Sequence, residues 1–458
     1  MSNGRTHRPE IDHGACSACG GCTWACPARV LPSQAAEIDS LRGALFRARP
    51  YPGEPADLPP CRMACPLGQD VPGYISAIAR GDLGTAARII SDTNALPSVC
   101  GRVCIASCMR ACSRAAIDEG LDIRGLKRFA VAAVEAVGPG RISVDTGSGR
   151  VAVVGGGPAG LAAAHRLLQL GLKPVVFEAG TRAGGLLVEA VAPFVLPEAR
   201  VAADVARLEG EGVEIRIGVR VGTDVPWEKL ETDHAAVLIA TGARRGLRPA
   251  LPGNALGGVV DAVTFGREAR SGGEGIAGGV VVLGGGKAGL QCARAARRLG
   301  ADPVTVVHPA PRALWPADAD DRAAAEEEGV TLLDGRVVAL EGDGSLSAVR
   351  VRTVTPGKAD AVGRVAPRAG AEQRFEVSVC VSATDRRPAP GDAPDFADLA
   401  RGPLGTLAID ASGRLSRPRW YAAGEAATGA ATVVDSMATG RRAAETIGRD
   451  LHGEGGRP

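Results

Sequence analysis

Residues 151–164 read VAVVGGGPAGLAAA, and their pattern indicates how the chain folds. A short apolar run predicts a buried strand, three glycines follow it, and a second apolar run predicts a helix. Gly155, Gly157 and Gly160 have the GxGxxG spacing that permits a tight turn and lets the backbone approach a pyrophosphate at the helix N-terminus. Glu178 ends the next predicted strand, where a carboxylate accepts hydrogen bonds from ribose hydroxyls. The stretch therefore predicts a dinucleotide-binding unit.

A second unit of the same plan lies farther along the chain. Residues 280–301 read VVVLGGGKAGLQCARAARRLGA, and Gly284 follows Gly155 by 129 residues. The repeated order of strand, glycine loop and helix predicts an α/β fold with two Rossmann-like dinucleotide-binding domains, not a short-period repeat.

The composition fits a chain of this kind and excludes others. The 458 residues suggest about three domains at roughly 150 residues each. Lys plus Arg number 53 and Asp plus Glu number 51, so the net charge of +2 gives no field that would attract nucleic acid or an anionic membrane. The N-terminus lacks the apolar core of a signal peptide, and no apolar run approaches the ~18 residues that span a bilayer. We therefore expect a cytoplasmic protein with no nucleic-acid or membrane partner.

The cysteines are concentrated near the N-terminus. Ten of the 12 precede residue 113, a clustering that in the cytosol favours metal or cluster ligation over disulfides. Four of them have the x2-x2-x3 spacing of bacterial ferredoxins, followed by Pro27, which predicts one [4Fe–4S] cluster. A zinc site or a chance grouping is the alternative. These predicted ligands are Cys16, Cys19, Cys22 and Cys26.

A second group of six cysteines follows, and we expect most of them to bind iron as well. They are Cys61, Cys65, Cys100, Cys104, Cys108 and Cys112. The last four are spaced by four residues, which would keep them near one face of a helix if the segment is helical.

The segments around these cysteines resemble a known domain. The quoted matches are ACPLGQDVPGYISAIARGD (64–82), LPSVCGRVCIASCMRAC (96–112) and DIRGLKRF (122–129). They resemble the cysteine-rich helical domain of the glutamate synthase small (β) subunit and of the N-terminal region of dihydropyrimidine dehydrogenase. That family carries another cysteine pair before the position of Cys61, and residues 47–60 contain none. The six cysteines therefore fill one cluster and leave two, or serve two clusters that other ligands complete.

Two further stretches complete a resemblance to flavoproteins with two dinucleotide domains. They are VLIATGA (237–243) and WYAAGEAATGAATVVDSMATGRRAAETI (420–447), where Glu425 replaces the family's usual aspartate. The resemblance implies that FAD is bound by Gly155, Gly157, Pro158, Ala159, Gly160, Glu178, Gly185, Leu186, Thr241, Gly242, Gly424, Glu425, Thr432 and Val433.

The second glycine loop resembles the NAD(P)H domain of the same family, with several departures. The implied NAD(P)H contacts are Gly284, Gly286, Lys287, Ala288, His308 and Arg312. Lys287 replaces an asparagine, and His308 is neither an acid suited to NADH nor an arginine suited to NADPH. The segment CVSATDRRP (380–388) also replaces the family's Ala-Ile-Gly. A nucleotide domain that keeps its fold without binding nucleotide is the alternative.

These observations divide the chain and suggest what it does. The expected segments are a ferredoxin-like segment (1–45), a helical iron–sulfur domain (46–145), the two parts of an FAD domain (146–250 and 383–458) and an inserted NAD(P)H domain (251–382). Residues 356–372 are expected to form an exposed loop. Cys292 and Cys380 are expected in the core and not as a redox-active pair, so a disulfide reductase is disfavoured.

The sequence thus predicts an oxidoreductase that passes electrons between NAD(P)H, FAD, one to three [4Fe–4S] clusters and a larger catalytic subunit or a ferredoxin. The ferredoxin-like segment is not part of ordinary glutamate synthase small subunits, which favours another partner, such as a 2-oxoacid oxidoreductase. Hydride transfer to a flavin needs no acid–base side chain, so we name no catalytic residue. The alternative is a subunit that holds FAD and clusters inside a complex without meeting free nucleotide.

Overall fold

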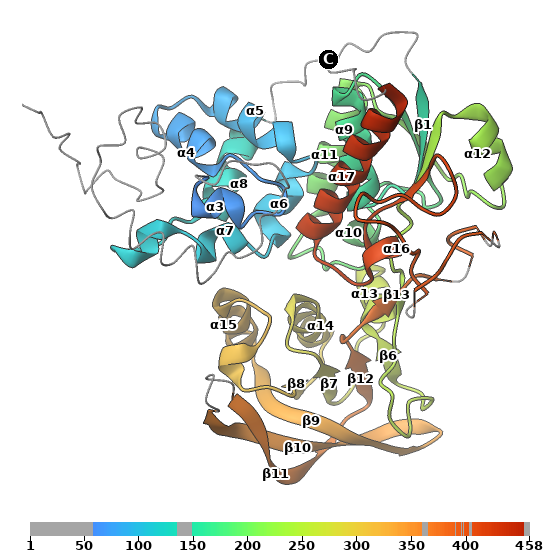
Figure 1. Cartoon of the computed structure of the whole chain (residues 1–458). Coiled ribbons are helices and arrows are strands. Elements are labelled where there is room, and N and C mark those ends of the chain that lie inside the picture. Colours follow the sequence, from blue (N-terminus) through green and yellow to red (C-terminus); the bar gives the residue numbers. More distant parts are fainter. Residues whose placement is uncertain are drawn as a thin grey trace, which may run out of the picture.

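The computed structural model describes residues 58–134, 149–359, 365–389, 391–394, 396, 398–402 and 405–452. Figure 1 shows three parts: a group of helices in blue, a sheet covered by helices at its side, and a second sheet below them. The cysteines predicted to bind a ferredoxin-type cluster, at 16–26, lie outside the described residues.

The first sheet is parallel and contains the strand that precedes the first glycine loop. Its order is β14 (Trp420–Ala422), β4 (Ala236–Ile239), β1 (Arg150–Val154), β2 (Lys173–Glu178) and β3 (Glu214–Ile217). Its helices are α9 (Pro158–Gln169), α10 (Leu186–Glu189), α11 (Glu198–Glu211), α12 (Trp227–Asp233), α16 (Glu425–Thr428) and α17 (Val433–His452).

Successive residues of β1 bury their side chains on opposite faces of this sheet. Val151 and Val153 pack in the cluster that includes α9 and α17, whereas Ala152 and Val154 pack in the cluster that includes α12. Because both faces are covered, the strand is a continuous apolar run, as parallel strands usually are.

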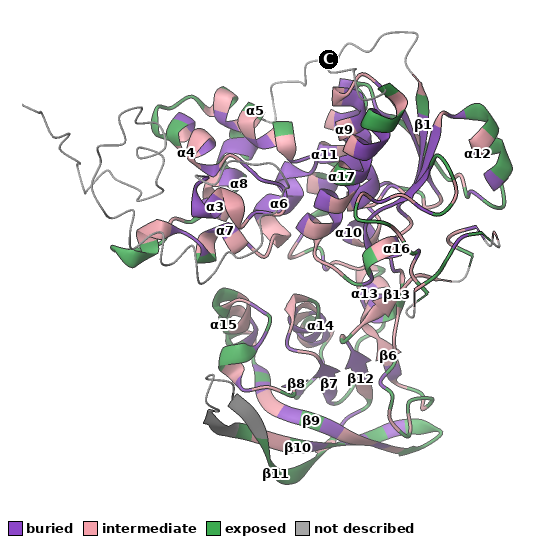
Figure 2. Ribbon diagram, viewed as in Figure 1, coloured by how far each residue is buried: buried purple, intermediate pink, exposed green. Residues whose placement is uncertain are grey.

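The second sheet contains the strand that precedes the second glycine loop. Its order is β11 (Val365–Glu376), β10 (Ser345–Ala359), β9 (Val330–Asp343), β8 (Val304–His308), β7 (Val280–Leu283), β12 (Val379–Ser382) and β6 (Val259–Asp261). The accompanying helices are α13 (Ala262–Arg270), α14 (Lys287–Arg298), α15 (Ala319–Glu327) and the 3₁₀ helix η2 (Arg312–Leu314). Figure 1 shows α14 and α15 between this sheet and the rest of the molecule, and Figure 2 shows β7 and β12 as buried. The predicted α/β fold with two Rossmann-like units is confirmed.

The expected loop at 356–372 is wrong for the described residues of this range, 356–359 and 365–372, although the expected exposure is right for 368–372. β10 continues to Ala359, and β11 begins at Val365 and pairs with it in the antiparallel direction. Residues 368–374 are exposed. The ribbon projects into solvent, so its polar composition resembles that of a loop although its backbone is paired.

The first part is helical, as expected. Its elements are α3 (Pro60–Met63), α4 (Val71–Ala79), α5 (Leu83–Thr93), α6 (Pro97–Val103), α7 (Ser107–Arg110), η1 (Ser113–Ala116) and α8 (Ile123–Val134). The four regularly spaced cysteines do not share one helix, however. α6 ends before Cys104, whose backbone is extended, and Ala106 has a left-handed φ of 51° before α7 begins.

The three parts contact one another at defined points. β5 (Arg245–Gly246) and β13 (Arg386–Arg387) form an antiparallel pair where the chain leaves the first sheet's domain and returns from the second. Asp204 of α11 accepts hydrogen bonds from the backbone N–H groups of Ser98 (3.2 Å) and Val99 (3.0 Å) at the start of α6. The second sheet and its helices, which we call the nucleotide unit, are therefore inserted in the domain that contains the first sheet. The cysteine-bearing helices dock on that same domain.

Cys292 and Cys380 are core residues, as predicted. They are 7% and 0% exposed, and each carries a free thiol. Burial raises the pKa of each to about 12. Separately, among the described residues no helix has both the length and the apolar character needed to traverse a bilayer.

Candidate functional site

The first glycine loop has the close backbone approach that the motif predicts. Gly155 has a φ of 111°, and a Cβ there would collide with the Ala240 carbonyl. A Cβ at Gly160 would overlap the carbonyl oxygen of Gly155. Gly157 differs, because none of the described residues has an atom within 4 Å of where its Cβ would be. Two glycines thus serve packing, and the third leaves open space.

Glu178 lies beside this loop. It is 6% exposed, and its Oε2 accepts a hydrogen bond from Gly156 N at 2.8 Å while its Oε1 accepts one from Gly180 N at 2.6 Å. These bonds hold the carboxylate at the end of β2, where a ribose would meet it.

The predicted FAD residues surround one cavity of about 520 Å³. All but Gly160 and Gly424 line it. The Oγ1 of Thr241 and the Nε of Arg386, both from lining residues, are buried without a hydrogen-bond partner among the described residues. A buried polar atom without a partner is unfavourable, so these two atoms fit a polar ligand in the cavity.

The C-terminal segment closes this cavity from another side. Glu425 begins α16, accepts a hydrogen bond from Ala431 N at 2.9 Å and forms an ion pair with Arg386. Thr432 and Val433 lie at the start of α17, which directs a 20-residue helix N-terminus at the cavity. Arg386 lines this cavity and the neighbouring one, and the sequence analysis did not single it out.

The second glycine loop repeats the first in detail. Gly284 has a φ of 118°, and no atom in the described part of the chain lies within 4 Å of a Cβ at Gly286. His308 ends β8, and its Nδ1 accepts a hydrogen bond from Gly285 N at 3.2 Å. Arg312 is turned away, since its guanidinium contacts Glu326 and the carbonyl of Leu332.

A larger cavity, of about 1040 Å³, lies next to the second loop. Of the predicted nucleotide residues, Gly286, Lys287 and Ala288 line it, whereas Gly284, His308 and Arg312 do not. Lys287 and Ala288 also line the 520 Å³ cavity. The two cavities therefore share the start of α14 as a common wall.

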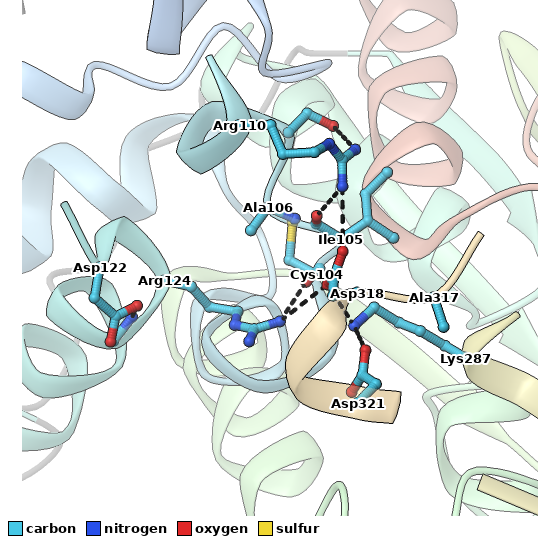
Figure 3. Close-up of polar contacts among 12 residues, drawn as sticks. Cys104, Ile105, Ala106, Arg110, Asp122, Arg124, Lys287, Ala317, Asp318 and Asp321 are labelled. Carbon is cyan, nitrogen blue, oxygen red and sulfur yellow. Dashed lines mark hydrogen bonds and ion pairs between the residues drawn. The ribbon is translucent and has the colours of Figure 1, made fainter. Parts of the chain in front are cut away.

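Lys287 belongs to a charged network that joins the nucleotide unit to the cysteine-bearing helices (Figure 3). Its Nζ lies 2.9 Å from Asp318 and is also paired with Asp321. Asp318 in turn pairs with Arg110 at 3.2 Å and lies 3.9 Å from Arg124. One carboxylate thus faces cations from two parts of the molecule.

Four cysteines gather around one buried lysine. Lys127 of α8 is 6% exposed; burial lowers its pKa, but the nearby thiols of Cys65, Cys100, Cys104 and Cys108 raise it, and the net shift is upward. Burial raises the pKa of Cys65, Cys100 and Cys108, and Lys127 opposes this. No group of three or more candidate ligands among the described residues is close enough for a single metal ion. A [4Fe–4S] cubane is larger than one ion, so the four thiols around Lys127 are candidate ligands for it.

Cys61 and Cys112 are placed differently from these four. They line a small hollow of about 40 Å³ together with Val71 and Ile123. Cys108 packs in the same core cluster as this pair, so the pair adjoins the four cysteines around Lys127.

The cysteine run also reaches the 520 Å³ cavity. Val103, Ile105 and Arg110 line it alongside the first glycine loop. Cys104 lies between two of these residues and is the only one of the six cysteines that is partly exposed. This contact was not predicted, although the apolar residues between the cysteines were a signal for it.

Comparison with known proteins agrees with this geometry. Residues 149–441 match the family described as "Pyridine nucleotide-disulphide oxidoreductase", and residues 56–138 match "Dihydroprymidine dehydrogenase domain II, 4Fe-4S cluster". These matches indicate the cofactors that the sequence predicts: FAD, a nicotinamide nucleotide and a [4Fe–4S] cluster.

Individual relatives cover most of the chain. It is 34% identical to the NADP(+)-dependent formate dehydrogenase subunit beta of Moorella thermoacetica, over 86% of this chain and 60% of that protein. It is 30% identical to the glutamate synthase [NADPH] small chain of Halomonas elongata, over 85% of this chain and 87% of that one. It is 31% identical to an NAD-dependent dihydropyrimidine dehydrogenase subunit of Escherichia coli, over 86% and 91%.

Solved structures show the same fold. The FprA protein of Mycobacterium tuberculosis, in complex with NADPH, matches with a TM-score of 0.55 and 18% identity, over 66% of this chain and 85% of that one. Two glycine loops, their surrounding cavities and the match over residues 149–441 lead to one conclusion. The chain belongs to the pyridine nucleotide-disulphide oxidoreductase family.

Proposed function

We propose that this chain is an electron-transfer oxidoreductase subunit that passes electrons between NAD(P)H, FAD and [4Fe–4S] clusters and a partner protein. The observation that carries the proposal is the shared wall of the 520 Å³ cavity. The glycine loop 155–160 and the cysteine run at 103–110 both line it. A group bound there would lie beside Cys104.

The residues proposed to hold FAD are those predicted from the sequence. Gly157 leaves room for the pyrophosphate, Glu178 faces the ribose, and the start of α17 presents its N-terminus to the cavity. Thr241 and Arg386 each supply a buried polar atom that has no hydrogen-bond partner among the described residues. When bound, FAD supplies two-electron acceptance and one-electron release, which links nucleotide and cluster chemistry.

The nucleotide is proposed to bind at the second loop, with its pyrophosphate at Gly286 and the start of α14. Gly284, Lys287, Ala288, His308 and Arg312 remain the other candidates. The 1040 Å³ cavity, which borders this loop, leads to the wall that it shares with the FAD cavity. A nicotinamide ring could therefore reach the flavin face without an acid–base side chain between them.

The clusters are proposed to use the cysteines as the structure groups them. Cys65, Cys100, Cys104 and Cys108 are the candidates for one cluster, and Lys127 offsets their negative charge. Cys61 and Cys112 would need further ligands for a second. The ferredoxin-type cluster at 16–26 stays a prediction from the sequence.

The partner is proposed to be a larger catalytic subunit or a ferredoxin, in the cytoplasm. The names of the relatives support this, because they include subunits of formate dehydrogenase, glutamate synthase and dihydropyrimidine dehydrogenase. The ferredoxin-like segment favours a partner other than a glutamate synthase large subunit, such as a 2-oxoacid oxidoreductase.

The role of Cys104 tests the proposal. Cys104→Ser should keep flavin bleaching by NADH or NADPH but lose most of the reduction of a one-electron viologen acceptor. Cys380→Ser is the matched control, because that thiol lies in β12, lines neither cavity and is outside the cysteine run, and it should keep both activities. Equal viologen reduction by wild type and Cys104→Ser would contradict the proposed route.

A second candidate function rests on the network at Lys287. With both Asp318 and Asp321 on its ammonium, Lys287 is not free to face an anion. A subunit that holds FAD and clusters without using free nucleotide would fit this arrangement. Anaerobic mixing separates the two roles: no flavin bleaching with either NADH or NADPH would favour the second.

A further inference from the structure

His308 occupies the place in the second dinucleotide site that Glu178 occupies in the first. In the first, the middle glycine, Gly156, donates its N–H to Glu178 Oε2 at 2.8 Å. In the second, the equivalent Gly285 donates to His308 Nδ1 at 3.2 Å. Both side chains end the strand that follows the glycine-loop helix. The residue at this place meets the adenosine ribose in dinucleotide folds.

The bond from Gly285 determines what the imidazole offers. Because Nδ1 accepts, the ring proton of the neutral form lies on Nε2, which is then a donor. Burial lowers the pKa of His308, although Asp334 opposes this, so the ring is uncharged at neutral pH. A carboxylate accepts from ribose hydroxyls and repels a phosphate. A neutral N–H donor suits the oxygen of either group.

The ring is held in this orientation by its neighbours. Trp315 packs edge-on against it with ring centroids 5.4 Å apart, and is itself 5% exposed. Trp315 Nε1 donates to Ala310 O and to Asp334 Oδ1, both at 2.9 Å. These contacts, together with the bond from Gly285 to Nδ1, fix the orientation of the imidazole.

The nearest arginine after the strand does not supply a charge for a 2′-phosphate. Arg312 pairs with Glu326 and donates to Leu332 O at 2.7 Å, and its backbone N–H donates to Asp334 Oδ2 at 3.0 Å. Binding a phosphate would require it to leave these partners. Among the described residues, no carboxylate stands at the strand end itself, since Asp334 is held by Trp315 Nε1 and the backbone N–H of Arg312, and Arg312 is not freely disposed to select NADPH.

We propose that His308 makes this nucleotide site accept NADH and NADPH with similar affinity, and that this residue sets the choice between them. The inference rests on the proposed nucleotide site and deepens it. A glutamate here would recreate the arrangement of Glu178 and exclude the 2′-phosphate. A glutamine would keep a neutral acceptor for Gly285 and a neutral donor for the ribose.

The test is binding of NAD⁺ and NADP⁺ to the flavin-loaded protein by anaerobic calorimetry, which needs no turnover. Wild type should bind both with Kd values within about tenfold of each other. His308→Glu should weaken NADP⁺ relative to NAD⁺ by at least about tenfold. His308→Gln should leave the ratio near that of wild type. Flavin content shows that each variant is folded.

The outcomes are distinguishable. A wild-type preference of more than about 100-fold for either nucleotide would overturn the inference and leave the nucleotide site intact. If His308→Glu and His308→Gln changed the ratio of the two Kd values equally, the inference would also be overturned. The imidazole would then act only through packing. Binding of neither nucleotide would overturn the proposed site together with the inference.

Discussion

Single glycines in the two loops differ in what their missing side chains allow. Gly155 and Gly284 have positive φ angles and touch backbone, so larger residues would disturb the fold there. Gly157 and Gly286 have φ values of −78° and −87°, and a Cβ built on either has no neighbour within 4 Å among the residues that the structure describes. The space beside these two is therefore available to a ligand and is not used by the protein.

Alanine at Gly157 should affect flavin binding, and alanine at Gly286 should affect nucleotide binding. Gly157→Ala should lower the flavin-to-protein ratio, because its methyl group enters the space of the pyrophosphate, while the stability of flavin-free protein changes little. Gly286→Ala should keep the flavin and weaken nucleotide binding. Flavin absorbance and calorimetry measure the two effects.

The control for these variants is Gly84→Ala. Gly84 lies in the first turn of α5, where the only nearby atom is Asp82 Oδ1 at 3.8 Å from a Cβ. This change should alter neither the flavin content nor the binding of the nucleotide. Full flavin content in Gly157→Ala would show that the loop does not contact a pyrophosphate.

Much of each loop could be predicted at this scale, and some residues could not. The GxGxxG spacing indicates the loop and the role of Glu178, because both depend on local geometry. Arg386 in β13 and Glu425 in α16 are 39 residues apart, so no periodic pattern in the sequence predicts their ion pair. The contact of Ile105 with the 520 Å³ cavity was marked only by the apolar residues between the cysteines, because it depends on how two domains dock.

At the scale of elements, α6 is held by a group from another domain. Asp204 of α11 is 2% exposed and accepts two backbone N–H groups at the N-terminus of α6. A carboxylate there is favoured by the helix dipole. Burial nevertheless raises the pKa of Asp204 to about 6, and the hydrogen bonds offset it in part.

The raised pKa of Asp204 determines how its contribution to the stability of the fold changes with pH. The folded state holds this proton up to about pH 6, whereas the unfolded chain loses it near its ordinary pKa of 3.8. The contribution of Asp204 to stability therefore falls as the pH rises from about 4 to 6.

Asp204→Asn removes this dependence, because the amide does not titrate. Relative to wild type, the variant should gain about 1 kcal/mol of stability between pH 5 and pH 7. The difference in anaerobic thermal unfolding midpoints across this range measures the gain. A constant difference would show that Asp204 does not ionise in this window.

The cysteine run shows why elements are harder to predict than motifs. A spacing of four residues suits one helix face, but the chain bends at Cys104 and Ala106 and starts a new short helix. Ala106 N donates to the Cys104 sulfur at 3.4 Å in this bend. Spacing alone does not distinguish a helix from a turn that wraps a cluster.

The Asp318 network should determine how firmly the nucleotide unit contacts α7. Asp318→Asn should increase hydrogen exchange of α7 amides by a few-fold, because surface ion pairs of this kind contribute about 0–1 kcal/mol each. Asp302→Asn is the matched control, since Asp302 is 79% exposed and pairs with Arg297 within its own unit. Equal exchange in both variants would show that the network does not hold these parts together.

At the scale of the whole molecule, the three parts meet around two cavities. The cysteine-bearing helices contribute Val103 and Ile105 to one cavity and Met63 and Pro66 to the other. The general plan of two dinucleotide units and a cysteine-rich domain could be predicted, because each part has its own motif. The contacts between the parts could not, because they depend on surfaces that no motif marks.

The N-terminal segment gives a prediction that is independent of these contacts. Cys19→Ser or Cys22→Ser should remove about four iron atoms per chain, one cluster's worth, if residues 16–26 bind a [4Fe–4S] cluster. Flavin content should not change. Iron and acid-labile sulfide analysis of anaerobic protein measures this, and unchanged iron would refute the ferredoxin assignment.

The central claim is that nucleotide, flavin and clusters exchange electrons within one chain. Its most direct test is an anaerobic titration of the purified protein with NADH and with NADPH, followed by visible absorbance and electron paramagnetic resonance. We expect flavin bleaching to be accompanied by the signal of a reduced cluster, and we expect Cys104→Ser to weaken that signal. Protein that contains flavin and iron but shows no cluster reduction, by either nucleotide or after the flavin is reduced photochemically, would contradict it.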